Sequence, residues 1–351
     1  MTVEGDAEPE DHLDFGGDFS GNAGAITGLG VQLAMREGIR GNKTLGNLTL
    51  IPCGIRKVPA MVRLGENRYG KAEVRVVRVA RGVAADGGDV IKDWNVSSSL
   101  SGDLAASHLT GDNSDVLATD TQKNTAYAFA KRLGAVEPEM LGVELAAHFV
   151  RSQRAITRAR IAIEEYGWTR IGAGGHSFAR SGELTRVTTV IHDQELGTSV
   201  VSGIENLTVL NTTGSEFWGF PRDEYTTLAE TKDRILATQV SAWWRYRAAA
   251  GVDWAAAFTG AHHALLAAFS GTYSYSLQQT LYSIGERIIA SQPAICEVRL
   301  ALPNKHHFLV DLAPFGLEND REVYYAADRP YGLIEGTVLA DDAADAGIAW
   351  S

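Results

Sequence analysis

Cysteine and positive charge are both scarce in this chain of 351 residues. Only two cysteines occur, Cys53 and Cys296, and no C-x-x-C pair or other disulfide framework is present, so a reducing compartment is expected. Lys and Arg total 32 against 43 Asp and Glu, which gives a formal net charge of −11. This balance argues against a general binder of nucleic acid or of anionic membranes, although it leaves room for a local basic pocket that binds an anion.

Long apolar segments and targeting signals are missing as well. No apolar run approaches the roughly 18 residues that a membrane-spanning helix needs. The first 18 residues contain seven acidic residues and no Lys or Arg, which is the reverse of a secretory signal. The final AGIAWS differs from the Ser-Lys-Leu peroxisomal signal. The sequence therefore predicts a cytoplasmic protein with no membrane partner.

The common metal and nucleotide motifs are absent too. There is no HExxH motif, no glycine-rich phosphate loop and no Cys/His spacing typical of a metal site. The adjacent His262 and His263 would point about 100° apart on a helix, which makes a poor chelate. The stretch GAGGHSF (172–178) lacks the strand-then-helix context of a dinucleotide-binding loop, so we predict a turn there. We expect neither a metal nor an organic cofactor.

Apolar residues are plentiful, and the chain changes character near residue 60. Hydrophobic residues make up 45 % of the sequence, enough for one large domain or two of ordinary size. Residues 1–60 hold 11 of the 37 glycines and show no sustained periodicity. We predict that residues 1–63 form a flexible N-terminal extension and that Met61 is a candidate start of the functional protein.

The rest of the chain repeats one pattern of strands and helices. The predicted faces of the first strand are Ala72, Val74 and Val76 on one side and Lys71, Glu73 and Arg75 on the other. The order continues with a strand region ending at 115–120, helices at 122–133 and 138–154, strands at 156–171, 183–193, 197–210 and 234–247, helices at 253–269 and 275–291, and strands at 296–302, 305–312 and 332–339. Two ββααββ copies predict an α+β fold with antiparallel sheets and helices on one face. The predicted domains are residues 64–195 and 196–340, followed by a tail at 341–351.

Polar residues that could take part in binding or catalysis lie at the ends of these elements in the second half. In LPNKHHFLVDL (302–312), Asn304 and His306 share one face of a strand, where they offer an amide and an imidazole to one spot. A satisfied polar pair at a strand end is the plainer interpretation. Gln278 lies in the first turn of a helix that Ser276 and Gln279 would cap, where free N–H groups favour an anion.

Two further residues of the second half have plain structural interpretations beside a functional one. Arg234 follows a predicted capping box, Thr227 with Glu230, and enters a strand, where by itself it fits a surface arginine. Phe217, in EFWGF, fits a core position.

The first half supplies three more candidates. Lys71 lies on the polar face of the first predicted strand. Thr119 and Asp120 lie where a predicted strand passes into a helix, and the plainer interpretation is that Asp120 or Thr121 is the N-cap of that helix.

Six stretches of the chain are together similar to the urate oxidase (uricase) family. These are YGKAEVRVVRV, VLATDTQKNTAYAFAK, LTVLNTTGSEFWGFPRDEYTTLAETKDRILAT, SLQQTLY, LPNKHHFLVDL and ADRPYGLIEGTV. They follow the family's order from about residue 64 to residue 340, and six separate matches make chance agreement negligible. Residues 1–60 lie outside the resemblance, and GAGGHSF matches the family only loosely.

The resemblance implies a tunnelling fold (T-fold), with two ββααββ units per chain, which agrees with the repeat found above. Chains of this family pair so that their sheets close a barrel around a tunnel, and two barrels stack into a homotetramer with active sites between subunits. The implied reaction is the cofactor-independent oxidation of urate by O₂ and water to 5-hydroxyisourate and hydrogen peroxide in purine breakdown. The implied partners are therefore urate, O₂ and further copies of the chain.

The resemblance also implies a role for each matching position that holds the substrate. Phe217 would stack on the purine, while Arg234 and Gln278 would bind its two ends. The backbone N–H of Leu277 would add a donor, and Asn304 would hold O₂ and then water above the ring.

The remaining positions would move protons or bind the purine edge. Lys71, Thr119 and His306 would form a proton relay, with Lys71 and Thr119 supplied by the neighbouring chain. Thr119 would also contact the substrate, and Asp120 would bind near the purine edge through its backbone.

Two rival interpretations stay open at the level of sequence. One is another tunnelling-fold enzyme that acts on pterins or guanine nucleotides, although the buried Glu anchor and zinc ligands usual in such enzymes are not recognisable. The other is a purine-binding protein without catalytic activity, against which the presence of Lys71, Thr119 and His306 argues.

Overall fold

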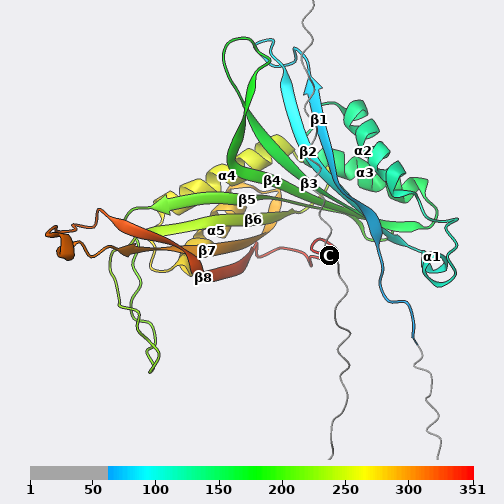
Figure 1. Ribbon diagram of the computed structural model, residues 1–351. Helices are drawn as coiled ribbons and strands as arrows, with labels where there is room; N and C mark the ends of the chain where they lie inside the picture. The colour runs from blue at the N-terminus through cyan, green and yellow to red at the C-terminus, as the bar shows by residue number, and fades with distance from the viewer. Residues whose placement is uncertain (1–61) are drawn as a thin grey trace, which may run out of the picture. The chain divides into compact units, whose positions relative to one another are not determined.

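The computed structural model describes residues 62–351, which form one curved antiparallel sheet with helices against it (Figure 1). The chain divides between Ala60 and Met61, and the predicted N-terminal extension lies almost entirely outside the described residues. The eight strands follow chain order across the sheet: β1 (Tyr69–Ala80), β2 (Val90–Gly102), β3 (Ile156–Arg170), β4 (Phe178–Asp193), β5 (Gly197–Asn211), β6 (Leu236–Tyr246), β7 (Ile295–Leu309) and β8 (Tyr324–Leu339). The helices are α1 (Ala105–Leu109), α2 (Thr119–Leu133), α3 (Pro138–Ser152), α4 (Trp254–Gly271), α5 (Leu277–Ser291) and the 3₁₀ helix η1 (Ala313–Phe315).

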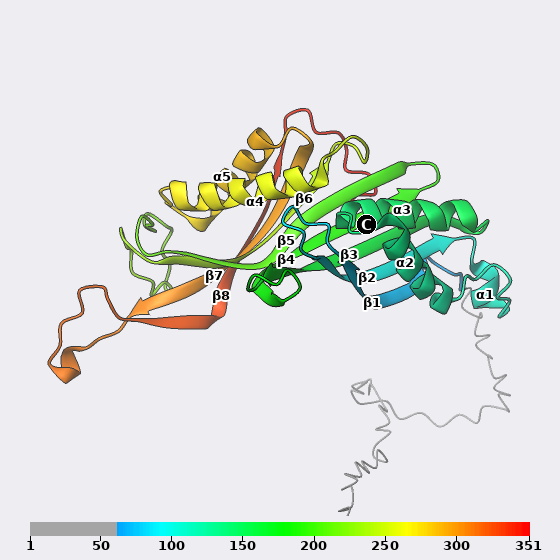
Figure 2. The same ribbon diagram turned by 90° about the horizontal axis from the view of Figure 1, so that it is seen from above.

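The four long helices lie on one face of the sheet, α2 and α3 over the first repeat and α4 and α5 over the second (Figure 2). Alternation in the strands explains this layering. In β3, for example, Ala159, Ile161 and Ile163 are buried, whereas Arg158 and Arg160 point to the uncovered face. Leu145 of α3 is among the helix side chains buried in the same core. The predicted α+β architecture with a repeated ββααββ unit is therefore confirmed.

Three element predictions were wrong, each for a local reason. The second strand ends at Gly102 rather than near residue 120, because its partner β3 begins at Ile156 and Gly102 already pairs there. The predicted strands at 296–302 and 305–312 are one continuous strand, β7. Thr227 and Glu230 start no helix, and the Glu230 carboxylate instead accepts a hydrogen bond from the Gly219 N–H at 3.0 Å.

The two repeats meet at β4 and β5, which are joined by the short turn 194–196 that contains the predicted domain boundary. A buried ionic cluster crosses this junction. Arg186 of β4 contacts Glu139 at 2.7 Å and also pairs with Glu137. Ser202 of β5, in the second repeat, donates a hydrogen bond of 2.5 Å to Glu139. Residues of both repeats therefore hold this carboxylate of the first repeat.

No helix between residues 62 and 351 combines the length and the apolar character required to cross a membrane.

Candidate functional site

A β-bulge in the first strand decides where Lys71 points. Lys71 pairs with Ser98 and Val74 pairs with Val96, so two residues of β1, Ala72 and Glu73, oppose a single residue of β2. Glu73 adopts φ 56°, which accommodates the extra residue. The bulge shifts the alternation by one position, and Lys71 therefore lies on the helix-covered face with Val74.

The alternation in the sequence predicted that Lys71 and Val74 lie on different faces of the strand. That prediction was wrong because periodicity alone does not reveal a bulge. Ala72 was predicted to share the buried face and is instead exposed.

The glycine before Lys71 is required by the close approach of the two strands. A Cβ on Gly70 would lie 1.8 Å from the carbonyl oxygen of Ser98. We predict that Gly70→Ala forces the start of β1 away from β2 and lowers the free energy of unfolding by about 1–3 kcal/mol. Thermal denaturation measures the loss. Gly65→Ala, with nothing within 4 Å of its Cβ, is the matched control, and equal behaviour of the two variants would contradict the prediction.

Lys71 lies close to the beginning of α2, which carries Thr119 and Asp120. Thr119 is the first residue of the helix, and the N-cap residue Ala118 offers no side-chain cap, so the alternative of Asp120 as N-cap does not apply. The Asp120 carboxylate accepts hydrogen bonds from Lys123 and, at 3.0 Å, from Asn124. Lys123 is the main cause of the lowered pKa of Asp120, and the charge of Lys71 contributes. Lys71, Thr119 and Asp120 therefore form one group at this helix end.

A second group forms around Arg234, immediately before β6. The Arg234 N–H donates to the carbonyl oxygen of Ser215 at 2.9 Å, and its Nε donates to the Ser215 hydroxyl at 3.1 Å. Burial lowers the pKa of the Arg234 guanidinium. Within residues 62–351, no carboxylate lies at ion-pair distance from it, so this cation is available to an anionic ligand.

Phe217 lies beside this arginine, with its ring centroid 5.3 Å from the guanidinium carbon of Arg234. Reciprocal backbone hydrogen bonds with Thr231, at 2.8 and 3.0 Å, hold Phe217 in place. Its ring stacks on Phe220 at 5.0 Å with an interplanar angle of 14°. Phe217 is only half-buried and lies outside the hydrophobic core, so the core interpretation does not describe it.

The start of α5 adds Leu277 and Gln278 to the same neighbourhood. Ser276 caps the helix by accepting a hydrogen bond from the Gln279 N–H, and the Gln279 side chain accepts one from the N–H of Tyr275. Gln279 therefore has the capping role expected from the sequence. Leu277 is the first residue of the helix, where backbone N–H groups have no partner within the helix. The Gln278 side chain is exposed and forms no hydrogen bond within the described residues.

Asn304 and His306 project from β7 on the helix-covered face, beyond Leu300 and Leu302. The neighbouring strand β8 bulges opposite them, since Asn304 pairs with Gly332 but His306 pairs with Ala327. Neither side chain forms a hydrogen bond with another residue of the described part of the chain. The interpretation of Asn304 and His306 as a hydrogen-bonded polar pair at a strand end was therefore wrong.

The His306 imidazole has a lowered pKa. Burial is the main cause, followed by the positive charge of Arg234 and by His307. Asn304 pairs with Thr238 of β6, the strand that Arg234 precedes, so Asn304 and His306 belong to the second group.

One chain thus collects the candidate residues into two groups rather than one. Lys71 lies on β1, the first strand of the sheet, and His306 lies on β7, six strand positions away. At about 4.8 Å per position the separation along the sheet is roughly 29 Å. Side chains do not bridge such a span, so a single copy does not assemble all candidates around one ligand.

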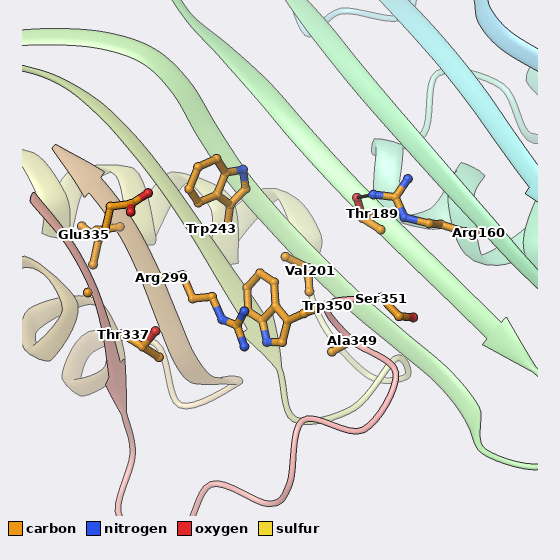
Figure 3. A pocket seen from close by; sticks show the side chains of 12 residues that line it. Arg160, Thr189, Val201, Trp243, Arg299, Glu335, Thr337, Ala349, Trp350 and Ser351 are labelled. Atoms are coloured by element: carbon orange, nitrogen blue, oxygen red, sulfur yellow. Dashed lines mark hydrogen bonds between the residues drawn. The ribbon is translucent and has the colours of Figure 1, made fainter. Parts of the chain in front are cut away.

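The uncovered face contains a separate hollow of about 500 Å³ (Figure 3). Its lining includes Arg160, Trp243, Arg299 and Trp350, and the guanidinium of Arg299 lies 3.9 Å from the Trp350 ring. None of the candidate residues lines this hollow. Among residues 62–351 there is also no group of three or more His, Cys, Asp or Glu residues able to hold a metal ion.

Three hydroxyl residues near Arg234 were not singled out from the sequence: Ser215, Ser274 and Thr280. They are fully or almost fully buried. In the sequence they look like ordinary polar residues of loops and a helix, and no motif distinguishes them.

Comparison with known proteins identifies relatives of most of the described chain. The Uricase family model matches residues 67–191 and 200–335. A uricase of Arthrobacter globiformis is 52 % identical over 277 residues, which cover 79 % of this chain and 90 % of that protein. A uricase of Dictyostelium discoideum is 39 % identical over 284 residues, covering 79 % and 98 %. The crystal structure of uricase from Arthrobacter globiformis matches with a TM-score of 0.78 at 48 % identity, covering 83 % of this chain and 99 % of that one.

Proposed function

The chain belongs to the uricase family, and we propose that it oxidises urate with O₂ and water to 5-hydroxyisourate and hydrogen peroxide, without a cofactor. The observation that carries this proposal is Arg234. It is a half-buried cation with no carboxylate partner within residues 62–351, it lies beside the half-buried ring of Phe217, and it suits a flat anion. A guanidinium fork binds an anionic carbonyl–nitrogen edge in a bidentate manner, and the Gln278 amide would bind the opposite edge.

The remaining candidates suit the proton chemistry that this reaction needs. Urate becomes a better reductant of O₂ when a further proton is removed, so the protein must hold the anion, accept the proton and keep O₂ over the ring. The lowered pKa of His306 favours the neutral imidazole, which accepts protons. We assign proton transfer to Lys71, Thr119 and His306, and the position of O₂ and then water to Asn304. Leu277 and Asp120 would bind the purine through backbone groups.

A second copy of the chain would complete each site. The sheet ends in two open edges, β1 and β8, and pairing with another copy would close it into a barrel. An isologous two-fold arrangement would bring Lys71 and Thr119 of one subunit to Arg234 of the other, and the separation of these residues within one chain supports it. We propose a homotetramer made of two such barrels, with active sites at the subunit interfaces.

Subunit mixing tests the shared site. Thr119→Ala and Arg234→Ala should each be inactive when refolded alone. Refolded together, about half of the dimers should be mixed, and each mixed dimer should hold one intact and one doubly damaged site. Roughly a quarter of all sites should therefore recover activity. Oxygen consumption with urate measures the recovery. Exchange of subunits without any returning activity would place the whole site within one chain.

Treatment with a chelator separates this proposal from its rivals. Metal-stripped protein should consume O₂ on addition of urate at the rate of untreated protein. Loss of activity that zinc restores would favour a metal-dependent enzyme of the same fold. Urate binding without O₂ consumption would indicate a non-catalytic purine-binding protein. The cytoplasmic location stays a prediction that cell fractionation would test.

A further inference from the structure

Three buried hydroxyl side chains lie where the arginine side of the candidate site meets the glutamine side. They are Ser215, Ser274 and Thr280, referred to here as the hydroxyl bracket. Ser215 and Ser274 are 0 % exposed and Thr280 is 1 % exposed. The Thr280 hydroxyl donates to the Ser274 hydroxyl at 2.8 Å, and the Ser274 hydroxyl donates to the carbonyl oxygen of Ser276 at 3.0 Å. Ser215 accepts a hydrogen bond from Arg234 Nε at 3.1 Å.

Backbone hydrogen bonds join the two ends of the bracket. Ser215 and Ser274 form an isolated parallel bridge. The N–H of Glu216 donates to the Ser274 carbonyl oxygen, and the N–H of Ser274 donates to the Gly214 carbonyl oxygen, both at 2.9 Å. The loop that carries Phe217 is thereby fixed against the turn that precedes α5. Arg234 on one side and Gln278 on the other belong to one hydrogen-bonded unit.

The polar character of these three residues calls for an explanation, because small apolar residues fill buried space equally well. Buried hydroxyl groups stabilise a fold only modestly, but each hydrogen bond that they form restricts the arrangement of the group that it holds. Ser215 holds the side chain of Arg234, and Ser274 with Thr280 holds the turn that leads into Gln278. The backbone bridge between Ser215 and Ser274 joins these two parts. A ligand bound at both ends needs these groups at a fixed separation.

We propose that the hydroxyl bracket sets the separation between Arg234 and Gln278 and so determines the length of planar anion that the site accepts. Ser215, Ser274 and Thr280 are positioning residues, which act through the groups that contact the ligand. The inference rests on the proposed function, in which Arg234 and Gln278 bind opposite ends of urate.

Steady-state kinetics of Thr280 variants test the bracket. Thr280→Val keeps the shape of the side chain and removes the hydroxyl, whereas Thr280→Ser keeps the hydroxyl. We expect Thr280→Val to raise the KM for urate about fivefold to tenfold, the effect of losing an ordered hydrogen bond, with a smaller change in kcat. The KM of Thr280→Ser for urate should stay within about twofold of that of the unchanged protein. Ser215→Ala should raise KM at least as much, because it also frees the guanidinium of Arg234.

Ser202→Ala is the control for loss of a buried hydroxyl elsewhere. Ser202 is 0 % exposed and donates to Glu139, far along the sheet from the bracket. This variant should lower the melting temperature and leave the KM unchanged. An unchanged KM in Thr280→Val, or equal effects of Thr280→Val and Thr280→Ser, would overturn the bracket. Absence of urate oxidation by the unchanged protein in the same assay would instead overturn the proposed function.

Discussion

Turnover of urate should fall by on the order of 10²- to 10⁴-fold when Lys71 is replaced by methionine, while the KM changes little. The bulge at Ala72 and Glu73 turns Lys71 toward the face that α2 covers, and its charge contributes to the lowered pKa of Asp120 at the start of that helix. Methionine retains much of the length of the side chain and removes its titratable group. Proton transfer should be lost while the groups that hold the ring stay in place. Oxygen uptake over a range of urate concentrations separates kcat from KM.

Lys131→Met is the matched control for this experiment. Lys131 lies in the last turn of α2, at the other end of the helix from Thr119, and is exposed. The same chemical change there should leave both kinetic constants unaltered. A raised KM with normal turnover in Lys71→Met would make Lys71 a binding residue. Two unaltered constants would remove Lys71 from the site.

The largest loss of stability is expected from Arg186→Leu, at about 3–5 kcal/mol in the free energy of unfolding. Arg186 is buried at the junction of the repeats and pairs with Glu137, Glu139 and, at 3.5 Å, Glu165. Burial alone would lower the pKa of Arg186, but the three carboxylates outweigh it and the pKa is raised. Leucine would leave the fully buried Glu139 without its cation. Chemical denaturation at fixed protein concentration measures the change.

Two further variants make the interpretation specific. Arg186→Leu combined with Glu139→Gln removes the unpaired charge and keeps an acceptor for Ser202, so the double variant should be more stable than Arg186→Leu alone. Arg154→Leu breaks an exposed ion pair with Asp115, where Arg154 is 88 % exposed, and should change stability little. A double variant as unstable as the sum of its single changes would show that charge compensation is not the cause.

Local chemistry determined what the sequence could predict. The repeated order of strands and helices follows from periodicity, and apolar alternation fixes which face the helices cover. The cap at the start of α5 could also be predicted from the sequence, because Ser276 and Gln279 interact within one helical turn and need no long-range contact. The same rule failed for Thr227 and Glu230, because Glu230 bonds to Gly219 of a distant part of the loop instead.

Tertiary structure decided the orientation and grouping of the site residues. Lys71 faces α2 only because one extra residue in β1 reverses the alternation, and pairing with β2 rather than residue type creates that bulge. Ser215, Ser274 and Thr280 acquire their positions through burial between segments that are far apart in the chain. The division of the candidates between β1 and β7 follows from strand order. Strand order depends on long-range pairing, which periodicity over a few residues does not encode.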